Sequence, residues 1–127
     1  MSRHIASLVI TTAFVLSASA TAHAQAADGD KTFFDFQVEQ TVRVKTVRAP
    51  EFPDRLRAMG KEQQVLVQFV VDERGQAQMN TFKVIKSTDG ELTESVRRAI
   101  STSSFFPAEY QGHKVKQLVQ QPFTFKP

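Results

Sequence analysis

The sequence contains no cysteine and no tryptophan, and its three histidines are at positions 4, 23 and 113. Without cysteine the chain can form no disulfide and lacks the thiolate ligands of structural zinc sites. Two of the histidines lie in the N-terminal segment, so His113 alone cannot assemble a metal centre. The composition therefore predicts a protein without a metal or any other cofactor, whose stability depends on its hydrophobic core.

Motifs for catalysis are also missing from the sequence. There is no glycine-rich loop of the kind that holds phosphate groups. Ser101, Ser103 and Ser104 lack the glycine-flanked turn that presents a serine nucleophile. The adjacent carboxylates Asp72 and Glu73 suit a hairpin turn better than acid–base chemistry. We therefore expect no catalytic residues and no enzymatic activity.

Charge is nearly balanced, with 16 Lys and Arg against 13 Asp and Glu and a formal net charge of +3. This small excess gives no reason to expect a nucleic-acid partner.

The first residues have the pattern of a secretory signal. Arg3 is followed by an apolar run over residues 5–16, and the small residues after it end in Ala22-His23-Ala24. A charged start, a short apolar centre and an A-x-A motif are typical of a cleaved signal peptide, which we place at residues 1–24. The alternative is an uncleaved membrane anchor, and the protein would contact a membrane only if this segment were retained.

The remaining chain is organised as one domain. Residues 25–37 are a mixed segment that we interpret as a flexible leader, although it contains Phe33, Phe34 and Phe36. Residues 38–127 form the predicted domain. Within residues 38–48, Val42 and Val44 alternate with cationic residues, which leaves two interpretations open: a half-exposed strand or an extended leader.

A short helix is predicted after Pro53, because proline suits the first turn of a helix. Its apolar stripe would consist of Phe52, Leu56 and Met59, and Gly60 would end it.

A hairpin follows. Residues 65–71 alternate as a strand, residues 72–75 form a turn in which Gly75 adopts a positive φ, and residues 76–86 return. The alternation changes phase in the return strand, which predicts a bulge near Asn80 or Thr81.

A second helix is predicted over residues 92–100, where Leu92, Val96, Ala99 and Ile100 recur at helical spacing. Thr88 and Glu91 have the spacing of a capping box before it.

The string SSFFPAEYQG, residues 103–112, joins this helix to the last segment of the chain. We interpret it as a joint in which Phe105 is buried, Pro107 stops the helix and Gly112 allows a turn. The final strand has an apolar face interrupted by Pro122. Because proline has no N–H to donate, this strand should lie at an edge of the sheet.

The order helix, hairpin, helix, strand predicts an α+β fold with both helices on one face of a small antiparallel sheet. An N-terminal strand would extend it if residues 38–48 pair. An edge strand offers unpaired N–H and C=O groups to another chain, so binding by strand addition is the favoured function.

The ordered set of residues resembles the C-terminal domain of TonB-family energy transducers. The resemblance covers residues 48–126 and rests on Phe52-Pro53, Leu56, Gly60, the strand ending in Val71-Asp72, Gly75, Val84, Ser87, Gly90, the helix over residues 92–100, Phe105, Pro107-Ala108, Gly112 and Phe123-Thr124-Phe125. Phe52 stands where the family usually has tyrosine, and Ser103 stands where it often has tryptophan.

The resemblance implies a periplasmic module of two helices and a three-stranded antiparallel sheet. It implies a partner as well: the N-terminal segment of an outer-membrane receptor, or another envelope protein, added to the sheet as a strand in support of energy-coupled transport. The residues expected to contact the partner are Phe52, Pro53, Val115, Gln117, Val119, Gln121, Phe123 and Phe125. An alternative is a structural, self-associating domain in which the edge pairs with a second copy as a homodimer.

Overall fold

The computed structural model describes residues 30–127, and the predicted signal peptide at residues 1–24 lies outside them. None of the helices in this part of the chain is long and apolar enough to cross a membrane. The elements, in chain order, are β1 (Thr32–Phe33), η2 (Asp35–Gln37), β2 (Arg43–Thr46), α2 (Asp54–Arg57), β3 (Gln63–Val71), β4 (Ala77–Ser87), α3 (Gly90–Thr102), β5 (Ser104–Phe106), β6 (Ala108–Tyr110) and β7 (His113–Phe125).

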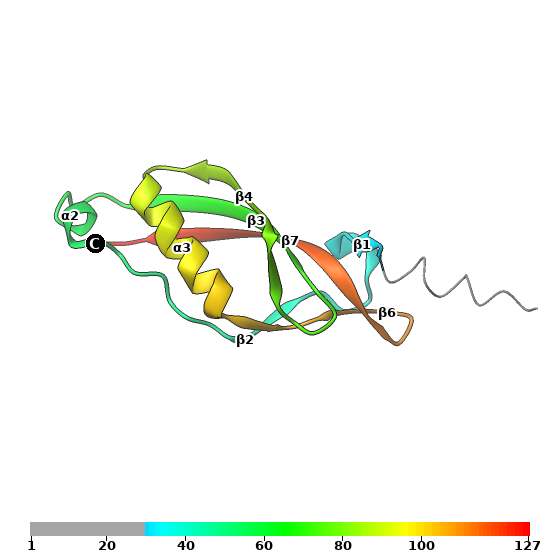
Figure 1. The fold of residues 1–127 in the computed structure, drawn as a ribbon. Helices are drawn as coiled ribbons and strands as arrows, with labels where there is room; N and C mark the ends of the chain where they lie inside the picture. Colours follow the sequence, from blue (N-terminus) through cyan, green and yellow to red (C-terminus); the bar gives the residue numbers. More distant parts are fainter. Residues whose placement is uncertain (1–29) are drawn as a thin grey trace, which may run out of the picture.

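The main sheet has the strand order β1-β7-β3-β4, with β6 paired to the first part of β7 (Figure 1). Its centre, β4-β3-β7, is antiparallel as expected, whereas β1 joins β7 in parallel. β2 and β5 form a separate pair. The α+β class is confirmed, but the sheet is mixed and larger than three antiparallel strands.

The N-terminal segment is more ordered than the sequence suggests. Residues 30–37, which fall within the predicted flexible leader, form β1 and η2. The extra strand expected from residues 38–48 exists as β2, but it pairs with β5 instead of extending the main sheet.

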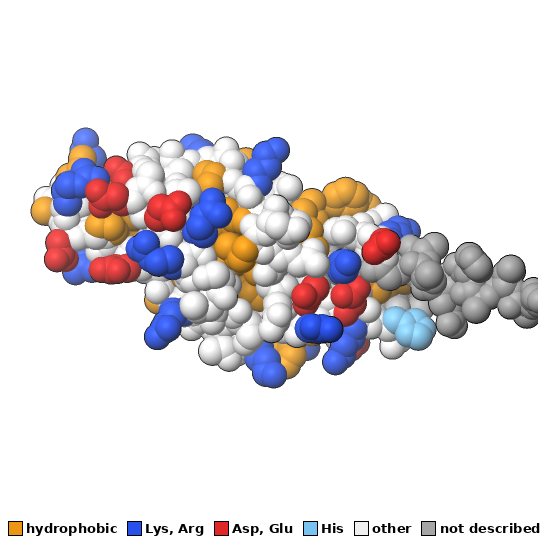
Figure 2. Space-filling view, viewed as in Figure 1, with side chains coloured by type: hydrophobic (Ala, Val, Ile, Leu, Met, Phe, Trp, Pro, Cys, Tyr) orange, Lys and Arg blue, Asp and Glu red, His pale blue; other side chains and the backbone are white. Residues whose placement is uncertain are grey.

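One helix, α3, covers one face of the main sheet (Figure 1). Lys, Arg, Asp and Glu side chains are interspersed on this side of the molecule (Figure 2). The other face of the sheet carries the alternate side chains of its strands, because successive residues point to opposite faces.

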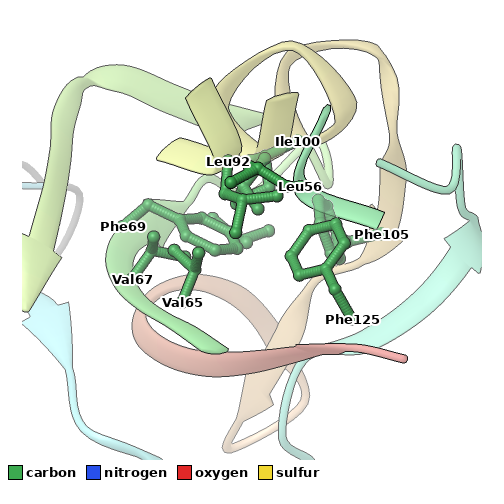
Figure 3. Packing of buried hydrophobic residues seen from close by; sticks show 10 residues of the cluster. Leu56, Val65, Val67, Phe69, Leu92, Ile100, Phe105 and Phe125 are labelled. Carbon is green, nitrogen blue, oxygen red and sulfur yellow. The ribbon is translucent and has the colours of Figure 1, made fainter. Parts of the chain in front are cut away.

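The core lies between α3 and the strands β3 and β7 (Figure 3). The predicted face of β3, namely Val65, Val67, Phe69 and Val71, is buried completely or almost completely. The predicted stripe of α3 meets it, because Leu92, Val96, Ala99 and Ile100 are all buried as well. A fully buried aliphatic or phenyl side chain contributes about 1.5–3 kcal/mol, so this layer is the main source of stability.

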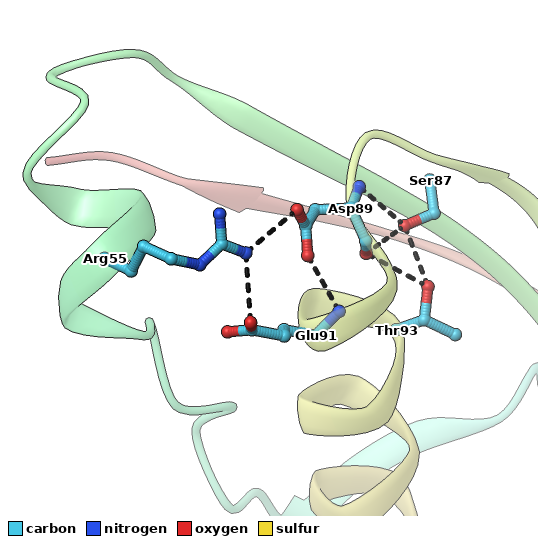
Figure 4. Close-up of polar contacts among 5 residues, drawn as sticks. All are labelled: Arg55, Ser87, Asp89, Glu91 and Thr93. Atoms are coloured by element: carbon cyan, nitrogen blue, oxygen red, sulfur yellow. Dashed lines mark hydrogen bonds and ion pairs between the residues drawn. The ribbon is translucent and has the colours of Figure 1, made fainter.

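The start of α3 differs from the predicted capping box. Asp89, not Thr88, is the N-cap, and its carboxylate accepts the N–H of Glu91 at 2.8 Å. Arg55 of α2 bonds to both Asp89 and Glu91, which joins the two helices at one end of the domain (Figure 4). The hydrogen bonds with Glu91 and Asp89 raise the pKa of the Arg55 guanidinium above its ordinary value.

α2 begins after Pro53 and buries Leu56, as expected, and Gly60 follows it with φ +67. Met59 was expected on the apolar stripe but is 52% exposed, because four residues of helix make only about one turn.

The predicted bulge in β4 is present. The register between β3 and β4 shifts between Gln68 and Val70, where the partners change from Lys83 to Gln78, and shifts again between Leu66 and Val67. The first shift places the extra residues around Asn80 and Thr81, and the Thr81 hydroxyl there accepts the N–H of Val70.

The predicted joint at residues 103–112 contains two short strands, β5 and β6. Phe105 is buried and its ring lies 5.7 Å from that of Phe69. Its N–H donates to the C=O of Gly75 at 2.8 Å, so the turn between β3 and β4 is fastened to the joint. Gly112, with φ +77, and Gln111, with φ 49, make the tight turn between β6 and β7.

The Gly75 contact generates a stability prediction. A Cβ at position 75 would lie 1.9 Å from the carbonyl oxygen of Phe105, and φ there is +81. We expect Gly75→Ala to lower the free energy of unfolding by about 2–4 kcal/mol, since strain and overpacking add. Chemical denaturation measures this.

Gly60→Ala is the matched control, because φ is +67 there but no atom lies within 4 Å of the added Cβ. It should lose only about 1–2 kcal/mol. Equal losses in the two variants would show that the close approach to Phe105 does not matter.

Candidate functional site

The main sheet has two outer edges, and only one of them is open and regular. β4 forms one edge, and its register shifts twice along its length. Lys83 and Lys86 also lie on β4. Bulges and lysines are devices that prevent an edge from pairing with another chain, so β4 is a poor docking strand.

β7 forms the other candidate edge, because it is paired along its whole length on one side only. β6 pairs with His113–Val115, and β3 pairs with the remainder from Gln117 to Phe125. On the opposite side β1 pairs with Lys116 and Gln117. Among residues 30–127 no strand pairs with that side from Leu118 to Phe125, and we call this segment the open rim.

The backbone groups that face the open rim can be identified from β3. The N–H of Val70 donates to Thr81, and the C=O of Gln64 accepts from Thr88, so both residues turn their backbone groups towards β4. In an antiparallel pair, two directly opposed residues either both turn their N–H and C=O groups towards each other or both turn them away. Their partners on β7, Leu118 and Thr124, therefore turn away from β3.

The register between β3 and β7 is continuous, so the same orientation applies at every second residue. Gln120 and Thr124 each present an N–H and a C=O to the open rim, and Pro122 presents a C=O. The C=O of Leu118 already accepts the side-chain amide of Gln117 at 3.4 Å. The rim therefore offers about five unused backbone groups over five residues.

Pro122 is compatible with a long strand because of this orientation. Its missing N–H would point to the open rim and not to Leu66 opposite it in β3, so the ladder with β3 loses nothing. The expectation that Pro122 marks an edge agrees with this geometry.

The connection from β2 to α2 passes near the rim without occupying it. The N–H of Arg48 donates to the hydroxyl of Ser103, and the C=O of Glu51 accepts the hydroxyl of Ser95. Ser95 lies within α3 and Ser103 caps its C-terminus. No backbone hydrogen bond joins this connection to β7 in the described part of the chain.

The residues expected to contact a partner are not the residues whose backbone groups face the open rim. Val115 and Gln117 lie where β6 and β1 already pair with β7. Val119, Gln121, Phe123 and Phe125 lie along the rim, but their side chains share the face of β7 that meets the core, and their backbone groups face β3. The available backbone groups belong to the even-numbered residues between them, which the sequence does not reveal without the register.

Phe52 and Pro53 lie at the far end of the rim. The ring of Phe52 is half-buried and its centroid is 5.4 Å from that of Phe125, so it closes the core where β7 ends. Pro53 precedes the first residue of α2 and directs that helix.

A sequence model of the TonB C-terminal family, described as Gram-negative bacterial TonB protein C-terminal, matches residues 48–127. The chain belongs to this family. The solution NMR structure of the Pseudomonas aeruginosa TonB C-terminal domain matches this fold with a TM-score of 0.56 and 24% identity, over 68% of this chain and 86% of that one. No curated protein sequence matches the chain significantly.

Membership of the TonB C-terminal family settles the general role. Domains of this family are non-enzymatic and serve energy transduction and protein interaction in the Gram-negative envelope, where they act in the periplasm and contact outer-membrane proteins. Within residues 30–127 no cluster of three or more His, Asp or Glu could hold a metal ion.

Residues 30–47 precede the segment matched by the family model, and we call them the N-terminal strap. Gln117 fastens the strap to β7. Its side chain is 4% exposed, and its carbonyl oxygen accepts the N–H of Val42 at 2.9 Å. β1 then pairs with the same stretch of β7 and limits the length of the open rim.

Replacing this side chain tests the role of the strap. We expect Gln117→Leu to remove the bond to Val42 and to speed hydrogen exchange of the Val42 amide about 2- to 12-fold, since one hydrogen bond is worth about 0.5–1.5 kcal/mol. Gln121→Leu is the control on the same face of β7, and Gln121 bonds to nothing in the strap. Unchanged exchange at Val42 in Gln117→Leu would contradict the assignment.

Proposed function

We propose that this TonB-family domain is a periplasmic binding module that captures an extended segment by strand addition at the open rim. The segment would come from the N-terminal part of an outer-membrane receptor, or from another envelope protein, and the contact would serve energy-coupled transport. The observation that supports this most is the set of unused backbone groups on Gln120, Pro122 and Thr124, beside a strand fixed on its other side by β3.

The energetics suit a reversible contact. Five main-chain hydrogen bonds at about 0.5–1.5 kcal/mol each are partly offset by the cost of ordering the guest segment. Affinity would then depend on side chains flanking the rim, while release stays easy. A module that must let its partner go requires this balance.

Self-association through the same rim is the alternative, because two copies could pair their open rims around a two-fold axis. Pro122 disfavours it. In a symmetric pair both strands lack the same N–H, so the ladder would lose a hydrogen bond on each side, whereas a foreign strand loses only one.

The strand-addition proposal predicts that methylating the backbone amides of a guest peptide abolishes binding at alternate positions only. We would use a peptide covering the N-terminal periplasmic segment of an outer-membrane receptor from the same organism, methylated on every second backbone amide in one phase or in the other. One phase should abolish binding, because its methyl groups replace the N–H groups that face β7, and the other should bind nearly as well as the parent peptide.

Backbone amide shifts of Gln120 and Thr124 measured by NMR would report where the peptide binds. Equal binding in the two methylation phases would rule out strand addition. Binding by no receptor peptide, with no shift at the rim, would rule out the module as proposed.

Pro122 itself gives a second prediction. Pro122→Ala restores an N–H on the open rim, so the receptor peptide should bind about 2- to 12-fold more tightly, the equivalent of one hydrogen bond of about 0.5–1.5 kcal/mol. Titration calorimetry measures this. The free variant should also self-associate more, and an unchanged affinity would show that Pro122 does not face the guest.

A further inference from the structure

The face of the main sheet opposite α3 carries two hollows that lie beside the open rim. One, of about 310 Å³, is lined by Phe34, Asp35, Gln68, Leu118 and Gln120. The other, of about 290 Å³, is lined by Gln64, Val65, Leu66, Lys86, Pro122, Phe123 and Thr124. We call them the Asp35 hollow and the Lys86 hollow.

The two hollows carry opposite charges. Asp35 is the one ionisable residue lining the first, and Lys86 is the one ionisable residue lining the second. Neither side chain forms an ion pair within residues 30–127. Among residues 30–127 the Asp35 carboxylate accepts only the N–H of Phe36, which leaves most of its acceptor capacity unused there.

Each hollow has further groups that suit a charged guest side chain. The Asp35 hollow adds the ring of Phe34, which is 48% exposed and can stack on a guanidinium, and the amides of Gln68 and Gln120. The Lys86 hollow adds the hydroxyl of Thr124 and the amide of Gln64, both of which can donate to a carboxylate.

The hollows lie in line with the rim. The first adjoins Leu118 and Gln120, and the second adjoins Pro122 and Thr124, so corresponding positions are four residues apart on β7, or about 13 Å. A guest strand on the rim points every second side chain to this same face. Two of its residues spaced by four would therefore lie beside the two hollows. Lys86 is on β4, three strand spacings or about 14 Å from the guest backbone, so its partner must be a long side chain such as glutamate that extends across β7.

We propose that the Asp35 and Lys86 hollows select the guest by charge: a basic side chain beside Asp35 and an acidic one beside Lys86, four residues apart on an extended peptide. Antiparallel pairing is the more stable arrangement, and in an antiparallel guest the acidic residue comes four positions before the basic one. This inference rests on the proposed function. It concerns Asp35 in η2, which lies outside the part of the chain matched by the family model.

The test uses two synthetic nonapeptides of identical composition on an alternating Thr and Val background. They differ only in whether Glu precedes Arg by four residues or Arg precedes Glu. We expect the domain to bind the peptide in which Glu precedes Arg about 3- to 10-fold more tightly, because in the antiparallel pairing only this order places both charges beside opposite ones. The preference should shrink as salt is added, because these charges are screened.

The double variant Asp35→Lys with Lys86→Glu exchanges the two charges and should invert the preference. Asp35→Asn keeps an acceptor for the N–H of Phe36 and should reduce the preference without changing the local structure. Lys114→Glu is the matched control, because it makes the same charge reversal on β7 at a position paired with Glu109 in β6, away from the rim. It should leave the preference unchanged.

NMR shifts at Gln120 and Thr124 separate the two ways of failing. If both peptides bind at the rim equally well, or if the preference survives unchanged in the double variant, the charge selection is wrong and strand addition stands. If neither peptide shifts these amides, both proposals are overturned.

Discussion

The ladder between β3 and β7 is the constraint on which the rest of the structure depends. It runs without interruption from Gln63 with Phe125 to Val71 with Gln117, and it places the apolar faces of both strands against α3. The same ladder fixes which backbone groups of β7 are used and which remain free. Core stability and binding capacity are therefore two results of one register, and a slip by one residue would remove both.

The N-terminal strap determines how much of the β7 edge stays open. β1 and the side chain of Gln117 close the first part of the β7 edge, and η2 brings Phe34 and Asp35 to the point where the open rim begins. The guest strand that we propose would therefore begin next to β1 and would meet the Asp35 carboxylate there. In this proposal the backbone of β7 supplies affinity, and the choice among partners would come from side chains of η2, β3 and β4.

Much of the fold could be predicted from the sequence, because periodicity reports burial directly. The stripe of α3 and the inward face of β3 were predicted correctly residue by residue, and so was the bulge near Thr81. β1 was not, since two residues have no period, and its pairing joins Thr32 to Lys116 across most of the domain. The strand that carries the candidate site was predicted, but the residues with free backbone groups were not. The alternation of side chains shows which face each one points to and does not show which neighbouring strand each N–H faces.

The distance in sequence between β1 and β7 has a consequence for the order of folding. Contacts between residues far apart in the chain form late, since a long loop must close before they contribute. α3 and the β3–β4 hairpin can form from local contacts, β7 can then join β3, and a pairing of two residues is the natural last step. During that interval the folding domain presents a longer unpaired strand than the finished one, so two chains are most prone to pair incorrectly at this stage.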